Sequence, residues 1–186
     1  AVPEASTAER GTLETLRGGG FDVVFVALHG PGGEDGSVQG LLTLAGVSCT
    51  GSGVLASALA MDKVRTKQLL GAAGVPCAEH REVPRDLLRA AADDDEIYGR
   101  FPVPSVVKPV RGGSSFGTRV VRRREDLPEA LRAALDHDGR ALVEAYLPGV
   151  EVTCGVLGGG AEPAEALPLT EIVPKGEEFF DFRAKY

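Results

Sequence analysis

The stretch VVKPVRGGSSFG, residues 106–117, leads from a short apolar run through Lys108 into a loop of glycines and serines. Basic residues resume at Arg119. Glycine lets the backbone approach an anion, serine hydroxyls donate hydrogen bonds, and a lysine ammonium supplies a point charge. The stretch therefore suits the phosphates of a nucleotide, although a plain hairpin loop is equally compatible with it. It is not a Walker A motif, because the lysine precedes the glycines.

The composition limits the classes of function. The chain has 186 residues, of which 43% are hydrophobic, enough for one large or two small globular domains. A net charge of −7 argues against nucleic acid as a partner. No apolar run approaches the roughly 20 residues of a membrane span, so we expect no membrane partner. Three scattered cysteines fit a reducing, cytoplasmic location better than a disulfide framework.

The first part of the chain has the pattern of a βαβ unit. Residues 23–28 form a continuous apolar, β-branched run that predicts a strand buried on both faces. A helix is predicted from apolar spacing over 38–45, and a second strand over 47–50. Ligands of such units lie beyond the carboxyl ends of the strands. His29 and Glu34 occupy that position, although a histidine that is merely hydrogen-bonded at a sheet edge remains an alternative.

The middle of the chain is mainly helical. Residues 52–74 predict two helical pieces, with Asp62 capping the second. Residues 75–82 are expected to form an extended linker, and 84–98 another helix. The acidic run at 93–96 is expected to be a solvated turn rather than a metal site.

The second half predicts antiparallel strands with helices on one face, an α+β pattern. Strands are expected over 105–108 and 118–121 as a hairpin, over 140–146, and over 150–157 paired with 166–173. The helix between them has an apolar face formed by Leu127, Ala130, Leu131, Ala134 and Leu135. A domain boundary is expected near 74–83.

Two pairs of charged residues are further candidates for a nucleotide site. Lys63 and Lys108 both precede predicted turns, and two ammonium groups that converge on a phosphate chain would neutralise it. A solvated lysine on a helix surface is the alternative for Lys63. Glu144 and Glu151 bracket an apolar segment with a turn, and such a carboxylate can accept bonds from ribose hydroxyls. Two glutamates that flank a hairpin remain possible.

Short motifs run in order along most of the chain, at residues 27–30, 33–36, 50–53, 57–59, 61–63, 107–109, 113–117, 143–144, 149–151, 171–172 and 184–186. In sequence and spacing they resemble the D-alanine–D-alanine ligases of the ATP-grasp superfamily. The resemblance implies an α/β N-terminal part with a parallel sheet, residues 1–76 with a helical connection. An α+β ATP-grasp domain would follow over 77–186 and include the start of a C-terminal domain, up to the lid loop.

The resemblance also implies an activity, a set of partners and a site. ATP would phosphorylate one D-alanine and a second would attack the acyl phosphate, giving a dipeptide for the bacterial cell wall. The expected cofactors are ATP and Mg²⁺, with Mn²⁺ possible, and the expected assembly is a homodimer. The residues implied to bind ATP are Lys63, Lys108, Gly113, Ser114, Ser115, Gly117, Glu144, Leu147, Glu151 and Lys185. The catalytic residues implied are His29, Ser114 and Tyr186.

Within that implied site, residues 144–147 would form the adenine hinge and Glu151 would bind the ribose. His29 would lie beside the first D-alanine, and Ser114 with Tyr186 would orient the substrate and hold the lid loop closed. Tyr186 also favours a dipeptide over a D-alanyl-D-lactate product. Ala145 and Arg183 depart from the family's usual lysine and acidic residue.

The resemblance leads us to expect an incomplete chain. The family's first strand would precede Ala1, and its metal ligands would follow Tyr186, so no metal ligand is expected among these residues. Two alternatives remain open: a non-catalytic nucleotide-binding module, and another carboxylate–amine ligase of the same superfamily.

Overall fold

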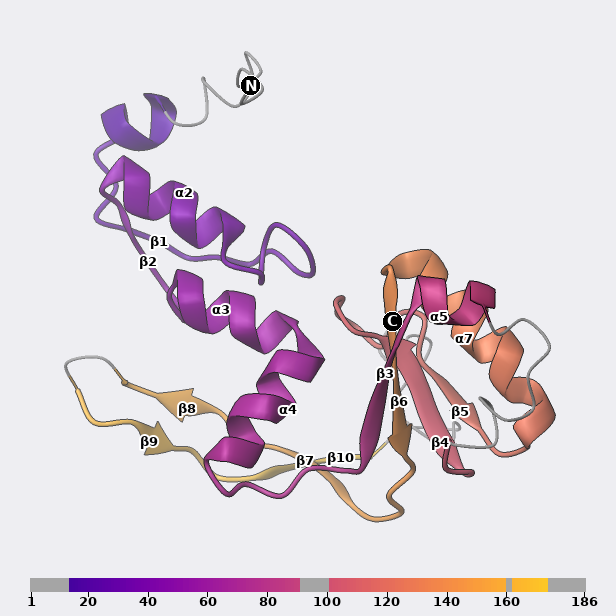
Figure 1. Ribbon diagram of the computed structural model, residues 1–186. Coiled ribbons are helices and arrows are strands. Elements are labelled where there is room, and N and C mark those ends of the chain that lie inside the picture. Colours follow the sequence, from indigo (N-terminus) through magenta and orange to yellow (C-terminus); the bar gives the residue numbers. More distant parts are fainter. Residues whose placement is uncertain (1–13, 91–100, 160–161, 174–186) are drawn as a thin grey trace. The chain divides into compact units, whose positions relative to one another are not determined.

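The computed structural model describes residues 14–90, 101–159 and 162–173 (Figure 1). The chain divides into two compact units. The first comprises Ala1–Cys77 together with Val110–Gly113, and the second comprises Ala78–Pro109 and Ser114–Tyr186. One boundary between the two units therefore falls inside the glycine-serine loop (residues 112–117), between Gly113 and Ser114.

The first unit contains the predicted βαβ arrangement. Strand β1 (Val23–Val24) pairs in parallel with β2 (Ser48–Cys49), and helix α2 (Ser37–Ala45) connects them. Gly46 ends α2 in the left-handed conformation, with φ of 75°, and its N–H donates to the last carbonyls of the helix. The parallel connection confirms the α/β character predicted for this part of the chain.

The prediction of a fully buried strand over residues 23–28 was wrong. Only Val23–Val24 is a strand, and the side chains of Val23, Phe25 and Leu28 are 57%, 78% and 58% exposed. Among the described residues this sheet has two strands, so β1 has a single partner and few neighbours to cover its faces. An apolar run becomes a buried strand only where other elements pack on it.

Two helices follow, as predicted. Helix α3 (Val54–Met61) leads to α4 (Lys63–Ala72) with Asp62 between them. The Oδ1 atom of Asp62 accepts a hydrogen bond from the backbone N–H of Arg65 at 3.0 Å, which satisfies one of the free donors at the start of a helix. This confirms Asp62 as the cap.

The second unit is built on a four-stranded antiparallel sheet in the order β3-β6-β4-β5 (Figure 1). Its strands are β3 (His80–Pro84), β4 (Ser105–Pro109), β5 (Arg119–Val121) and β6 (Arg140–Ala145). Its helical elements are α5 (Arg85–Ala90), the short 3-10 helix η1 (Arg124–Asp126) and α7 (Leu127–His137). The predicted α+β pattern is confirmed here.

The core of this unit lies between α7 and the sheet. All five residues of the predicted apolar face of α7 are buried, and they cluster with Val83, Val107, Val121 and Val143 from the four strands. Side chains alternate between the two faces of a strand. In β4, Val107 is therefore buried in this cluster, while Val106 and Lys108 are only half-buried on the opposite face.

Two predicted boundaries in the second unit were wrong. The expected linker 75–82 ends in a strand, because β3 pairs along its length with β6. The expected strand 150–157 is two strands, β7 (Glu151–Thr153) and β8 (Val156–Leu157). They pair with β10 (Thr170–Ile172) and β9 (Glu165–Ala166), which confirms the predicted pairing of 150–157 with 166–173, and the register changes by one residue between the two ladders.

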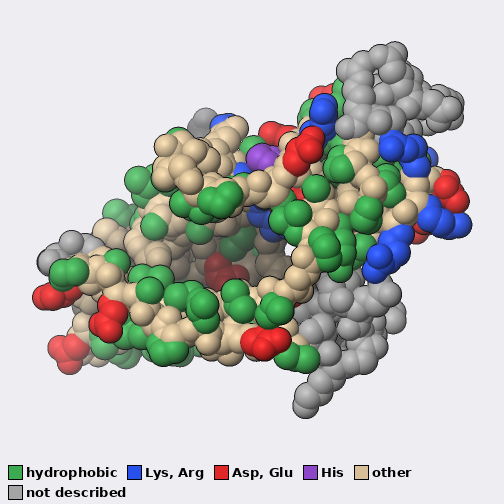
Figure 2. Space-filling view, turned by 90° about the horizontal axis from the view of Figure 1, so that it is seen from below, with side chains coloured by type: hydrophobic (Ala, Val, Ile, Leu, Met, Phe, Trp, Pro, Cys, Tyr) green, Lys and Arg blue, Asp and Glu red, His purple; other side chains and the backbone are tan. Residues whose placement is uncertain are grey.

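Part of the helix predicted over 84–98 is α5, and the remainder, with the acidic run 93–96, lies outside the described residues. Large apolar side chains are exposed on the face that Figure 2 shows and elsewhere. They include Leu55, Leu69, Val150, Val152, Val156 and Leu169. Within the described ranges, no helix combines the length and hydropathy needed to cross a membrane.

Candidate functional site

The glycine-serine loop has a distinctive backbone. Ser114 and Ser115 adopt left-handed conformations, with φ of 52° and 55°, and Gly117 has φ of 71°. A left-handed conformation costs a residue other than glycine roughly 1–2 kcal/mol. The N–H of Thr118 donates to the carbonyl of Ser115 at 3.1 Å, which closes a tight turn. Contacts around the loop must therefore maintain this conformation.

The segment Val110–Gly113 is held by the first residue of α4, within the first unit. The Nζ atom of Lys63 donates to the carbonyls of Val110 and Gly112 at 3.3 and 3.0 Å, and its backbone N–H also donates to Val110 at 3.2 Å. The alternative that Lys63 is a solvated surface lysine was wrong, because its ammonium contacts the backbone that leads into the loop.

The neighbouring Asp62 supports the same segment. Its side chain is 6% exposed, and its Oδ2 atom lies 3.5 Å from Nε of Arg111. Its other oxygen caps α4. One buried carboxylate thus fixes the start of the helix and holds Arg111 of the segment Val110–Gly113.

Lys108 forms an ion pair with Glu144 inside the second unit. The Nζ and Oε2 atoms are 2.5 Å apart, and the two side chains are 23% and 9% exposed. Glu144 lies opposite Val106 in the β4–β6 ladder, so Lys108 is its diagonal neighbour on the same face of the sheet. Breaking a pair this buried is costly, because the remaining charge then loses a compensating partner away from water.

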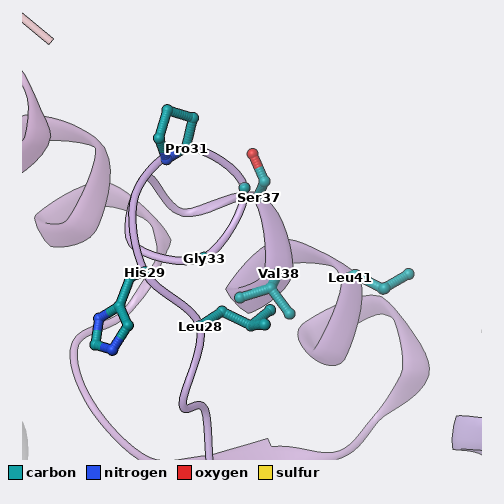
Figure 3. Close-up of a pocket in the computed structure, with 8 residues that line it drawn as sticks. Leu28, His29, Pro31, Gly33, Ser37, Val38 and Leu41 are labelled. Atoms are coloured by element: carbon teal, nitrogen blue, oxygen red, sulfur yellow. The ribbon is translucent and has the colours of Figure 1, made fainter. Parts of the chain in front are cut away.

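A separate pocket of about 430 Å³ lies in the first unit (Figure 3). It is lined by Leu28, His29, Pro31, Gly32, Gly33, Ser37, Val38 and Leu41. Figure 3 shows Leu28 extending toward Val38 of α2, with His29 on the opposite side of the loop. The pocket therefore combines an apolar wall, the first turn of α2 and an exposed imidazole.

Carboxylates inside the loop that follows β1 fix its shape. Glu34 Oε2 accepts from the N–H of Gly30 at 2.6 Å. Asp35 accepts from the N–H groups of Gly32 and Ser37 at 2.9 and 3.0 Å. These hydrogen bonds hold the pKa of the Asp35 carboxyl below its usual value. The bond from Gly32 lowers the pKa most, and the bonds from Ser37 come next. The loop is therefore most stable while Asp35 is ionised.

We expect Asp35→Ala to lower the free energy of unfolding at neutral pH but not in acid. Because the pKa of Asp35 is lower in the folded chain, the ionised carboxylate stabilises the fold above about pH 4, and this contribution disappears as the pH falls through the lowered value. Urea denaturation from neutral pH into acid measures the difference between wild type and Asp35→Ala. Asp22→Ala, at an exposed position before β1, is the control. A difference that grows toward acid contradicts the prediction.

Among the described residues, no group of three or more histidine, cysteine, aspartate or glutamate side chains could hold a metal ion.

Comparison with known proteins decides the family. A sequence model of the D-ala D-ala ligase N-terminus matches residues 3–52, and one of the D-ala D-ala ligase C-terminus matches residues 69–186. The chain belongs to the D-alanine–D-alanine ligase family. The resemblance found in its sequence motifs is thereby confirmed.

Curated members of the D-alanine–D-alanine ligase family are similar along most of the chain. The D-alanine–D-alanine ligase of Syntrophobacter fumaroxidans is 46% identical over 167 residues, covering 89% of this chain and 52% of the relative. That of Mycobacterium ulcerans is 47% identical over 170 residues, covering 89% and 45%. The chain spans about half the length of the curated ligases that it matches.

Solved ligases share the fold. The VanG D-Ala:D-Ser ligase from Enterococcus faecalis superimposes with a TM-score of 0.74 at 39% identity, over 89% of this chain and 47% of its own. The D-alanine-D-alanine ligase from Coxiella burnetii gives 0.71 at 35% identity, over 82% and 44%. The fold of this family member is thus the ATP-grasp ligase fold that its motifs predicted.

The residues implied to form the ligase site have varied surroundings. Lys108 and Glu144 are brought into direct contact, and Lys63 contacts Gly112 next to Gly113. Others are accessible: Ser114, Ser115 and Gly117 are half-buried, and His29, Leu147 and Glu151 are exposed. Lys185 and Tyr186 lie outside the described residues. The expected adenine hinge therefore begins at a buried glutamate that is already paired with Lys108.

Sequence reasoning missed two contacts of this ligase loop. Asp62 was identified only as a helix cap, although it also holds Arg111. His137 was not among the candidate residues, yet its ring contacts Phe116 of the loop. An aromatic residue among glycines and serines was the available signal for the second contact.

Proposed function

We propose that the polypeptide containing this chain joins two D-alanines at the expense of ATP, for bacterial peptidoglycan synthesis. The carboxylate of one D-alanine attacks the γ-phosphorus of ATP and releases ADP, which gives an acyl phosphate. The amine of the second D-alanine attacks the acyl carbon, loses a proton, and expels inorganic phosphate as the peptide bond forms. Such chemistry depends chiefly on positioning and charge neutralisation.

The observation that carries the proposal is the Lys108–Glu144 pair at the start of the glycine-serine loop. The carboxylate holds the ammonium at a defined place on the sheet, five residues before Gly113. Ser114 and Ser115 then offer hydroxyl and backbone donors in a tight turn. Lysine and hydroxyl donors fit the phosphates of ATP.

The individual roles form part of the proposal. The phosphates would be bound by Lys63, Lys108 and loop residues 113–117. Residues 144–147 would bind the adenine, and Glu151 would bind the ribose. His29 would lie beside the first D-alanine, which agrees with its place in the pocket before α2. Ser114 and Tyr186 would orient the substrate, and Lys185 would contact ATP.

The required metal is proposed on family grounds alone. The described residues do not form a site for Mg²⁺ or Mn²⁺. The division into a substrate part over 1–76 and an ATP-grasp part over 77–186, the homodimer and the cytoplasmic location are likewise proposals that follow from the family.

We expect the polypeptide that contains this chain to release ADP and phosphate only when D-alanine and ATP are both present. A coupled assay for ADP, together with detection of D-alanyl-D-alanine, measures this, and L-alanine is the control. Equal release with L-alanine, or none with D-alanine, contradicts the proposal. A D-Ala:D-Ser ligase is among the similar structures, so D-serine is tested as the second substrate. Faster reaction with D-serine would reassign the acceptor, and nucleotide binding without turnover would favour a non-catalytic module.

A further inference from the structure

The C-terminal end of the glycine-serine loop contacts the last residue of helix α7. The rings of Phe116 and His137 lie edge to face, with centroids 4.4 Å apart and planes at 63°. Aromatic rings prefer this geometry because the positive edge of one meets the negative face of the other. Phe116 is 55% exposed, so His137 covers part of an aromatic side chain that otherwise faces water.

Gly117 brings the backbone of the loop against the same histidine. A Cβ at this position would lie 2.6 Å from Cδ2 of His137 and 3.0 Å from Cγ of Pro109. Its φ of 71° also favours glycine. The loop therefore lies close against His137 at two successive residues, through the ring of Phe116 and the backbone of Gly117.

The backbone of His137 is held by a well-packed helix, although its side chain is exposed. His137 is the last residue of α7. That helix is anchored by Leu127, Leu131 and Leu135, each at most 1% exposed. Well-packed cores leave little freedom to the elements that form them. The backbone of His137 is thus tied to the core of the second unit, which also contains Ser114 and Ser115.

We propose that His137 is a positioning residue, which holds loop residues 114–117 in their phosphate-binding conformation through Phe116 and Gly117. The inference rests on the proposed function, since it assigns the loop to ATP. It extends that function to a residue that does not touch the substrate. Two successive serines in left-handed conformations need such external support. The role requires an aromatic ring at position 137 rather than a titrating group.

The first test compares variants in the polypeptide that contains this chain. We expect His137→Ala to raise the KM for ATP by about three- to tenfold, as the loss of one aromatic contact implies, with a smaller effect on kcat. His137→Phe keeps a ring and should restore most of the wild-type KM. Arg132→Ala, at an exposed position on the same helix, should leave the KM unchanged. An unchanged KM in His137→Ala, or no rescue by phenylalanine, overturns the inference.

The second test observes the loop directly. These 186 residues contain no tryptophan, so Phe116→Trp adds a fluorescent reporter to the loop, and subtracting the emission of the protein with Phe116 isolates its signal. We expect its steady-state anisotropy to fall when His137→Ala is added and to remain high with His137→Phe. Equal anisotropy in all three proteins overturns the inference. The measurement needs no turnover, so failure of this inference can be distinguished from failure of the ligase function. Failure of the ligase function would appear as a lack of D-alanine-dependent ADP release by the wild type.

Discussion

Lys108→Ala will reduce kcat/KM for ATP by about 100-fold or more, the order expected when one charge-stabilising donor is removed from a phosphoryl-transfer site. The structure holds this ammonium against Glu144, next to the glycine-serine loop. Steady-state kinetics with varied ATP and saturating D-alanine measure the effect. Lys67→Ala, which removes a lysine further along α4, is the control and should change ATP use far less.

Loss of stability has to be separated from loss of ATP binding. Lys108→Ala also removes the ion pair with the buried Glu144 carboxylate, so a loss of folding stability is expected beside the loss of ATP use. The double variant Lys108→Met with Glu144→Gln removes both charges and should recover most of this stability without recovering activity. Similar losses of ATP use in Lys67→Ala and Lys108→Ala contradict the assignment, as does an active double variant.

Leu131→Ala will lower the free energy of unfolding by about 2–5 kcal/mol, the range for a large apolar side chain removed from a packed core. Leu131 is 0% exposed and lies in the cluster between α7 and the four-stranded sheet. Urea denaturation followed by circular dichroism measures the change. The adjacent residue Arg132 is exposed, so Arg132→Ala should lower the free energy of unfolding by no more than about 0.5 kcal/mol. Comparable losses from both variants would mean that α7 does not anchor the core.

The sequence predicted those elements whose stability depends on their own periodicity. In α7 the apolar spacing and the buried face coincide, because residues three and four apart lie on the same side of a regular helix. The cap at Asp62 and the end of α2 at Gly46 were also predictable, since both depend on local backbone chemistry. The motif order identified the family before any geometry was known.

Contacts between distant residues could not be predicted in the same way. Lys63 reaches carbonyls 47 and 49 residues away, and no local pattern encodes that distance. The apolar run at 23–28 predicted burial, but burial also depends on how many strands surround it. The contact between Phe116 and His137 likewise arises only when β4, the loop and α7 are folded together.

The left-handed serines have a consequence for conformational entropy. Glycine would adopt the backbone angles of Ser114 and Ser115 without strain, but it would also populate many others. Serine narrows the ensemble of the free loop, so less freedom remains to be lost when a ligand orders it. The loop would thus exchange some stability of the fold for a smaller entropic cost of binding.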